Sequence, residues 1–164
     1  MTTPTSPVFI QTPATLWLAK HQLAFTLHAY DYVPHGGASH AAQCIGVAAH
    51  QLAKTLVMED QQQQPLIILM HGDCEVSLKQ LARQTKNKKV KPCLPAVAER
   101  HTGYHVGGTS PFGLRKPLPV WMQRTLLEYQ DIYINAGKRG LLLNINAQQA
   151  ANALHAQLVN VMRI

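Results

Sequence analysis

The segment over residues 102–113 has the composition that most directly suggests chemistry. It reads Thr-Gly-Tyr-His-Val-Gly-Gly-Thr-Ser-Pro-Phe-Gly, so four of its twelve residues are glycine. Glycine leaves no side chain between the main chain and a ligand, so Gly107 and Gly108 could present their N–H groups to a carbonyl or phosphate oxygen. The proline-stiffened turn that follows would have little freedom left to lose on binding. Gly, Ser and Pro also build turns that bind nothing, so composition alone leaves both interpretations open.

Cysteine and histidine are the other residue types that could carry chemistry. The chain has three cysteines, which are Cys44, Cys74 and Cys93. They are odd in number, widely spaced and without a Cys-x-x-Cys pair, so the sequence predicts neither a disulfide framework nor a zinc motif. Cys44 lies in an apolar segment and is expected to be buried. His101 and His105 have a helical metal-ligand spacing, but Gly103 lies between them in a predicted loop. The other candidate ligands are His35, His40 and His50, and they have no acidic cluster beside them. We therefore predict no metal site and no cofactor.

The overall composition limits the class of protein and its partners. A chain of 164 residues with 46% apolar and 14% charged residues fits one globular domain. Its formal charge of +7, partly concentrated in residues 86–91, favours polyanions over strongly cationic partners. No apolar run approaches the ~20 residues that span a bilayer, and the N-terminus lacks a secretory signal, so we expect no membrane association and a cytoplasmic location. Residues 1–11 are predicted to be a loose lead-in to a single domain over residues 12–164.

The elements that must position these residues can be predicted from caps and periodicity. Helices are expected where an N-cap residue precedes apolar residues at helical spacing, over residues 12–23, 39–50, 77–84, 94–100 and 146–161. Strands are expected over the short apolar runs 25–30, 55–58, 66–70, 131–134 and 141–145. A polar turn of four glutamines joins the second and third strands, and residues 135–140 make a hairpin of the last two. Strands and helices alternate without a βαβ rhythm, which predicts an α+β fold with a mixed, curled sheet and flanking helices.

Several of these segments together resemble a known family. They are Thr12-Pro-Ala-Thr-x-x-Leu, a strand ending His28-Ala-Tyr30, Lys54-Thr-Leu, the glycine-rich residues 102–113, and Ile132-Tyr-x-x-x-Gly-Lys-Arg-Gly-Leu141. In this combination the chain resembles the YbaK/EbsC family of free-standing aminoacyl-tRNA deacylases, relatives of the editing domain of bacterial prolyl-tRNA synthetases. The resemblance extends from Thr12 to the C-terminal region and implies a barrel-like curled sheet.

The resemblance implies hydrolysis of the ester that joins a wrong amino acid to the 3′ end of a transfer RNA. The expected substrate is mischarged tRNA(Pro), most of all Cys-tRNA(Pro), and prolyl-tRNA synthetase is an expected partner. An ester is already activated, so a site that positions it and stabilises its oxyanion suffices. The implied catalytic residues are Lys54, Gly107 and Gly108, and the implied substrate-binding residues are Tyr30, Thr109, Ser110, Pro111, Asn135 and Gly137.

Each implied role has a structural alternative that the sequence leaves open. Lys54 interrupts an apolar stretch and could instead be a surface lysine on the outward face of a strand. Tyr30 could stack on the terminal adenine or be a half-buried strand tyrosine. The hydroxyls of Thr109 and Ser110 could bind the substrate's amine or ribose, or close their own turn.

Two positions depart from the pattern of the cysteine-specific relatives. Those relatives carry a serine where this chain has Asn135 and an aspartate where it has Leu142, so the choice of amino acid could differ. Two alternatives follow: a deacylase for alanyl or seryl esters, and a non-catalytic tRNA-binding or regulatory module that keeps the fold.

Overall fold

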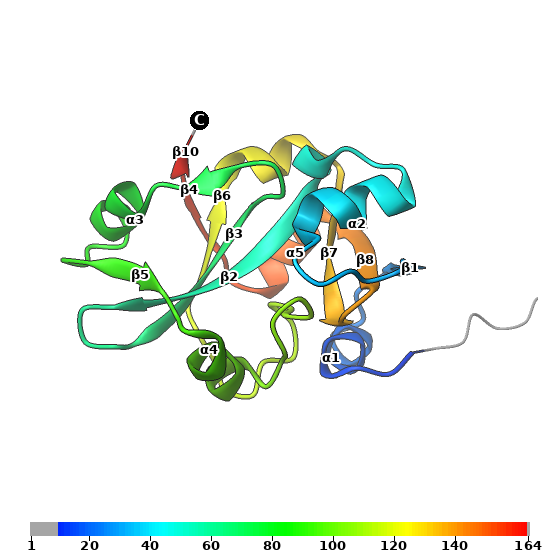
Figure 1. Cartoon of the computed structure of the whole chain (residues 1–164), viewed down its shortest axis with the longest axis horizontal. Helices are drawn as coiled ribbons and strands as arrows, with labels where there is room; N and C mark the ends of the chain where they lie inside the picture. The colour runs from blue at the N-terminus through cyan, green and yellow to red at the C-terminus, as the bar shows by residue number, and fades with distance from the viewer. Residues whose placement is uncertain (1–9, 164) are drawn as a thin grey trace, which may run out of the picture.

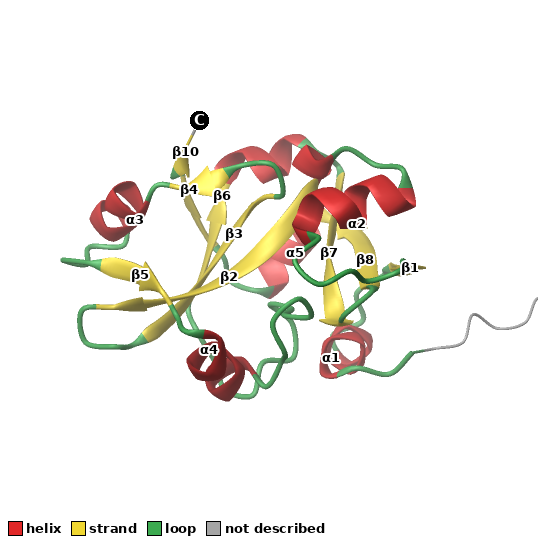
Figure 2. Ribbon diagram, viewed as in Figure 1, coloured by secondary structure: helices red, strands yellow, loops and turns green. Residues whose placement is uncertain are grey.

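The computed structural model describes residues 10–163 and contains two sheets flanked by short helices (Figures 1 and 2). The lead-in predicted over residues 1–11 lies outside the described residues apart from its last two. In chain order the elements are α1 (Pro13–Lys20), β1 (Thr26–Ala29), α2 (Gly37–Ile45), η1 (Ala49–Gln51), β2 (Leu52–Asp60), β3 (Pro65–His71), β4 (Glu75–Val76), α3 (Leu78–Gln84), β5 (Val90–Pro92), α4 (Pro95–Thr102), β6 (Val120–Gln123), η2 (Arg124–Glu128), β7 (Asp131–Lys138), β8 (Leu141–Asn146), α5 (Ala147–Ala153), β9 (Gln157–Val159) and β10 (Met162–Arg163).

The large sheet is mixed, as predicted, and has the strand order β1-β8-β7-β2-β3-β6-β9, with β5 on part of β2. The glutamine segment is the turn of the β2–β3 hairpin, in which the Asp60 carboxylate accepts hydrogen bonds from the N–H groups of Gln62 (2.8 Å) and Gln64 (3.0 Å). The predicted β7–β8 hairpin is also present, with a bulge between Asn135 and Lys138. The α+β class is therefore confirmed. The sheet is open rather than a closed barrel, because within residues 10–163 its end strands β1 and β9 do not pair with each other.

Helices pack on both faces of this sheet because its central strands are apolar on both sides. Along β3, Ile67 and Leu69 face a core that includes α1 and α5, whereas Ile68 and Met70 face a core closed by α3. A third cluster joins α2 to β2 and β8 through Leu52 and Leu142, among others. No helix within residues 10–163 is long and apolar enough to cross a membrane.

Local capping explains where the first helices begin and end. The predicted start of α1 is confirmed, since the Thr12 hydroxyl accepts a hydrogen bond from the Thr15 N–H at 3.0 Å. The helix predicted over residues 39–50 begins earlier and ends at Ile45, because Gly46 adopts a left-handed conformation (φ 74°) and terminates it. Cys44 near this end is exposed, so the prediction that it is buried was wrong.

The helix predicted over residues 146–161 is also wrong in its second half. Asn146 caps α5 as expected, accepting from the Gln149 N–H at 2.9 Å, but the helix ends at Ala153. The chain then pairs with β6 as the parallel strand β9, and Val159 and Val161 are buried at alternate positions. The apolar spacing was compatible with either element, and the free edge of β6 selected the strand.

Candidate functional site

The candidate site lies where two parallel strands of the sheet separate. Within residues 10–163, β2 and β7 pair only at Leu52–Tyr133 and Ala53–Ile134. Beyond this point β7 bulges, whereas β2 continues beside its other neighbour β3 (Figure 1). Because side chains alternate along a strand, Lys54 and Asn135, one residue beyond the last pair, project from the same face of the sheet. Ligand sites of open sheets commonly form where neighbouring strands diverge.

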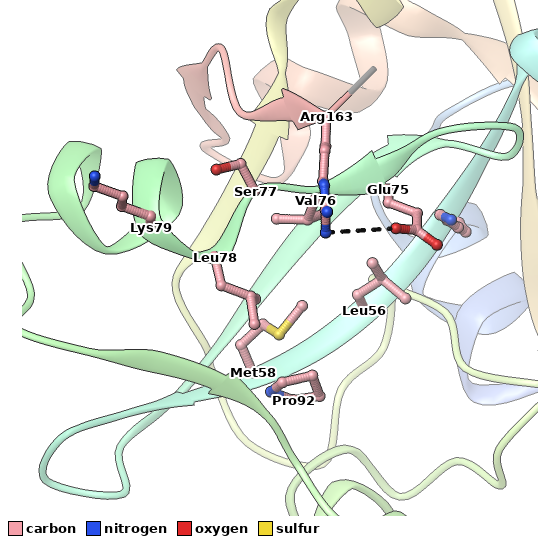
Figure 3. Close-up of a pocket in the computed structure, with 10 residues that line it drawn as sticks. Leu56, Met58, Glu75, Val76, Ser77, Leu78, Lys79, Pro92 and Arg163 are labelled. Atoms are coloured by element: carbon pink, nitrogen blue, oxygen red, sulfur yellow. Dashed lines mark ion pairs between the residues drawn. The ribbon is translucent and has the colours of Figure 1, made fainter.

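Lys54 lines a groove of about 490 Å³ on this face. Leu56, Met58 and Pro92 give the groove an apolar floor, and β4 with the start of α3 forms a wall (Figure 3). Its other lining residues are mostly polar or charged: Glu75, Val76, Ser77, Leu78, Lys79 and Arg163. Figure 3 shows Glu75 and Arg163 facing each other across the rim, with Arg163 Nη1 3.9 Å from Glu75 Oε2.

The charges of the groove favour an anion. Lys54, Lys79 and Arg163 are cationic, whereas Glu75 is the one acidic residue among the described residues of the lining. The Glu75–Arg163 contact is long and exposed, so it neutralises little of this charge. Within residues 10–163 the Lys54 ammonium makes no ion pair within 4.0 Å, so its charge is available to a ligand.

The glycine-rich loop packs onto the β7–β8 turn and onto Tyr32. Gly107 has a φ of 88°, and a Cβ at this position would lie 2.8 Å from the Tyr32 hydroxyl. A Cβ on Gly108 would lie 2.9 Å from the Arg139 main-chain nitrogen. The two glycines are therefore required by close approach, whatever ligand the loop binds. Arg139 secures the loop, since its Nε donates to the Val106 carbonyl at 2.8 Å and its guanidinium lies over the Tyr32 ring.

Asn135 connects this loop to the strand that carries it. Its Nδ2 donates to the Gly107 carbonyl at 3.1 Å, while its Oδ1 accepts from the N–H groups of Gly137 (2.7 Å) and Lys138 (3.2 Å). One side chain thus fixes both the bulge in β7 and the position of Gly107. The structure therefore brings Asn135, Gly107 and Gly137 into one contact network beside the β2–β7 opening. None of these three residues lines the Lys54 groove itself.

The main-chain donors of the loop are not equivalent. The Gly108 N–H already donates to the His105 carbonyl at 2.8 Å. The Gly107 N–H has no acceptor within residues 10–163 and is free to donate to a ligand. A substrate oxygen at Gly108 would have to share or replace the His105 carbonyl.

The other predicted residues of the loop contact their own turn. Ser110 is fully buried, and its hydroxyl accepts from the Phe112 N–H at 3.3 Å. The Thr109 hydroxyl donates to the His105 carbonyl at a long 3.4 Å. Pro111 lines a different cavity of about 380 Å³ beside Trp17, so the structure does not place it at the Lys54 groove.

Tyr30 continues β1 beside the same network. Its N–H donates to the Gly140 carbonyl at 2.9 Å, and its ring packs on the cluster of α2 and β2. Burial raises the pKa of its hydroxyl, which therefore stays protonated as a hydrogen-bond donor at neutral pH. Tyr30 is half-buried, which leaves part of the ring accessible.

A second group of reactive side chains was missed by the sequence analysis. His50, from η1, meets Asp73 and Cys74 in the turn after β3. The histidine and the aspartate are separated by 23 residues and approach because η1 precedes β2, the hairpin partner of β3. No local spacing signals this contact, although adjacent Asp and Cys directly after an apolar run could have drawn attention to the turn.

Solved structures with the same architecture support the fold assignment. The crystal structure of "a putative trans-editing enzyme for prolyl tRNA synthetase" superposes with a TM-score of 0.82 at 20% identity, covering 94% of this chain and 99% of that one. The crystal structure of hypothetical protein APE2540 gives a TM-score of 0.85 at 21% identity over 93% of this chain and 100% of that one. The open mixed sheet with its flanking helices is thus a fold shared with these structures.

The sequence comparison identifies the family. The family model of the aminoacyl-tRNA editing domain matches residues 35–153, which is more than half of the chain. The chain therefore belongs to the aminoacyl-tRNA editing domain family. It is 27% identical over 152 residues to the "Putative Cys-tRNA(Pro)/Cys-tRNA(Cys) deacylase EbsC" of Enterococcus faecalis, covering 92% of this chain and 93% of that protein. It is 28% identical over 109 residues to the uncharacterized protein YwhH of Bacillus subtilis, covering 66% of this chain and 69% of that protein.

Proposed function

We propose that this protein hydrolyses mischarged aminoacyl-tRNA in trans, with Cys-tRNA(Pro) as its substrate. Membership of the editing domain family supports the reaction, and the similarity to EbsC, whose name specifies cysteinyl esters, supports the substrate. Such a site corrects synthetase errors that binding cannot prevent, because one methylene is worth only ~1–3 kcal/mol of discrimination. The cytoplasm, where prolyl-tRNA synthetase would supply mischarged tRNA(Pro), is the proposed location.

The position of Lys54 is the observation that carries this proposal. Its ammonium is not paired within residues 10–163 and lines a groove with an excess of positive charge. A tRNA 3′ end presents a phosphate beside the terminal ribose, and a charge-assisted hydrogen bond from Lys54 would anchor it and orient the ester. The apolar floor below would accept the uncharged part of the aminoacyl-adenosine end.

The glycine-rich loop supplies the second part of the proposed site. The free N–H of Gly107 would donate to the ester carbonyl oxygen as negative charge develops there, and Asn135 would hold that donor in place. Gly108 would contribute by its close packing, with its own N–H shared with the loop. Tyr30 and Gly137 would line the entrance, whereas Thr109, Ser110 and Pro111 would keep the loop in shape.

With a cysteinyl ester the substrate can provide its own nucleophile. Its thiol sulfur attacks the carbonyl carbon, the carbon–sulfur bond forms as the carbon–oxygen bond to the ribose breaks, and the thiol proton ends on the ribose oxygen. Water then opens the resulting cyclic thioester, which completes the hydrolysis and releases cysteine. The protein then needs to hold a reactive geometry and to stabilise the oxyanion. Alanyl and seryl esters require attack by water instead.

A panel of Cys-, Ser- and Ala-charged tRNA(Pro), with and without prolyl-tRNA synthetase, tests this proposal. We expect Lys54→Ala to lower kcat/KM for the cysteinyl ester by about 10²-fold, because loss of the phosphate anchor would misplace the ester relative to the groups that act on it. Lys79→Ala is the matched control, because Lys79 lines the same groove away from the β2–β7 opening, and it should stay within threefold of wild type.

Three outcomes would contradict parts of the proposal. Near-wild-type hydrolysis by Lys54→Ala would remove Lys54 from the mechanism. Equal rates for the seryl and cysteinyl esters would exclude thiol attack as the main route. Saturable binding of tRNA without turnover of any ester would identify a non-catalytic tRNA-binding module, which the apolar, buried Leu142 in place of a carboxylate would then explain.

A further inference from the structure

His50, Asp73 and Cys74 bring three different metal-ligating atoms to one surface point outside the proposed ester site. His50 Nδ1 lies 2.8 Å from Asp73 Oδ1 and 4.0 Å from Cys74 Sγ. Cys74 Sγ lies 3.3 Å from Asp73 Oδ1, which closes the triangle. The side chains of His50 and Asp73 are 38% and 46% exposed, so an ion could enter from solvent.

The backbone and a buried histidine hold this triangle in place. The turn after β3 is anchored to η1, since the Gly72 N–H donates to the carbonyls of Ala49 (3.1 Å) and Leu52 (2.7 Å). The His50 ring stacks on His71, with ring centres 3.6 Å apart and an interplanar angle of 5°. His71 is itself fixed, because one ring nitrogen contacts the His50 carbonyl and the other lies 2.6 Å from the Thr125 hydroxyl. The orientation of the His50 ring is therefore determined before any ligand binds.

The geometry does not fit a nucleophile–histidine–carboxylate relay. In such a relay the histidine contacts the carboxylate through one ring nitrogen and the nucleophile through the other. Here the carboxylate and the thiol both approach Nδ1 of His50. Three potential ligands converging on a common point are instead the arrangement that a chelated cation requires.

We propose that His50, Asp73 and Cys74 form a binding site for a borderline-soft divalent cation, of which Zn²⁺ is the representative. Thiolate and imidazole ligands favour this class over Mg²⁺ or Ca²⁺. Tetrahedral Zn²⁺ with ordinary bond lengths separates nitrogen from oxygen by about 3.3 Å, and sulfur from either by about 3.6 Å. The three observed separations lie within roughly half an ångström of these values, so small side-chain rotations complete the site. Three protein ligands leave a fourth position for water or for an anionic ligand.

The position of this site is separate from the proposed ester chemistry, but close to the groove. Glu75, the next residue after Cys74, belongs to the groove that Lys54 lines. None of the three ligands is a residue assigned to ester binding. The metal proposal and the deacylase proposal can therefore fail independently.

Metal titrations of the untagged, chelator-treated full chain test the site. We expect one equivalent of Zn²⁺ to bind in calorimetry, and Co²⁺ to give a thiolate-to-metal charge-transfer band. Cys74→Ser should abolish that band. Cys74→Ser and Asp73→Asn should each weaken Zn²⁺ binding at least about tenfold, because loss of a direct ligand should cost no less than the 10–100-fold typical of supporting residues. Circular dichroism of each variant would show that it is folded.

Cys44→Ser is the matched control, because Cys44 is an exposed thiol that lies 3.5 Å from His40 Nε2. This variant should bind Zn²⁺ and Co²⁺ as wild type does. Absence of saturable Zn²⁺ binding by the wild-type chain would overturn the proposal. So would a cobalt band that survives in Cys74→Ser but disappears in Cys44→Ser, since the metal would then bind at the other thiol.

Discussion

Replacing Asn135 by alanine should both destabilise the fold and uncouple the glycine-rich loop from it. The substitution removes the donor to the Gly107 carbonyl and the acceptor for the N–H groups of Gly137 and Lys138. It leaves the bulge of β7 without the side chain that closes it. The same side chain thus supports stability through the turn and activity through the loop.

The magnitude follows from the three lost hydrogen bonds. Each contributes about 0.5–1.5 kcal/mol, and water can replace part of this at the exposed edge, so we expect a loss of about 2 kcal/mol in the free energy of unfolding. For a chain of this size each kcal/mol lowers Tm by about 2–4 °C, which predicts a decrease of about 4–8 °C. Urea unfolding with an unchanged m-value would confirm that the native state, rather than the unfolded one, is affected.

Asn135→Asp separates the two roles of this side chain. A carboxylate can still accept from Gly137 and Lys138, but it cannot donate to the Gly107 carbonyl and repels it. We therefore expect Asn135→Asp to lose less stability than the alanine variant and to lose a similar share of deacylation. An Asn135→Ala variant with the same Tm as the wild type would show that these hydrogen bonds do not stabilise the fold. An aspartate variant with full activity would show that the tether to Gly107 does not matter for catalysis.

Two further predictions concern the loop and the stacked histidines. Gly107→Ala should lower deacylation at least tenfold and should destabilise the fold more than Gly46→Ala does. Both glycines have a positive φ, at a strain of about 1–2 kcal/mol for alanine, but only a Cβ at Gly107 would meet a side chain, the Tyr32 ring. Equal losses of stability in the two variants would show that the contact with Tyr32 is unimportant. Burial lowers the pKa of His71 below its ordinary value of 6.5, so between these two values the unfolded chain binds a proton that the folded chain does not. The free energy of unfolding should therefore fall as the pH is lowered from about 7 through 6.5 and down to the lowered pKa. Urea titrations at each pH would measure this, and His71→Gln should flatten the pH dependence. An unchanged pH dependence in that variant would assign the effect to another group.

Much of the fold could be predicted because its signals are local. Thr12 and Pro13 begin α1, Ser77 caps α3, and the residues between Asn135 and Gly140 form the turn of a hairpin. Each depends on hydrogen bonds or dihedral angles within a few residues, and such preferences act before the rest of the chain is placed. The errors arose where a distant partner decided, as at residues 157–159, which follow a helical pattern and become a strand because β6 offers an edge.

The candidate site divides in the same way. The sequence by itself determined that a glycine-rich loop exists and that Lys54 interrupts an apolar stretch, and its resemblance to a family drew these residues together. Only the tertiary structure decided that β2 and β7 separate at Lys54 and Asn135, that the Gly108 N–H is used within its own loop, and that Pro111 faces another cavity. It also brought His50 to Asp73 and Cys74. Pairing between strands far apart in sequence fixes which side chains meet, and no short-range preference encodes that register.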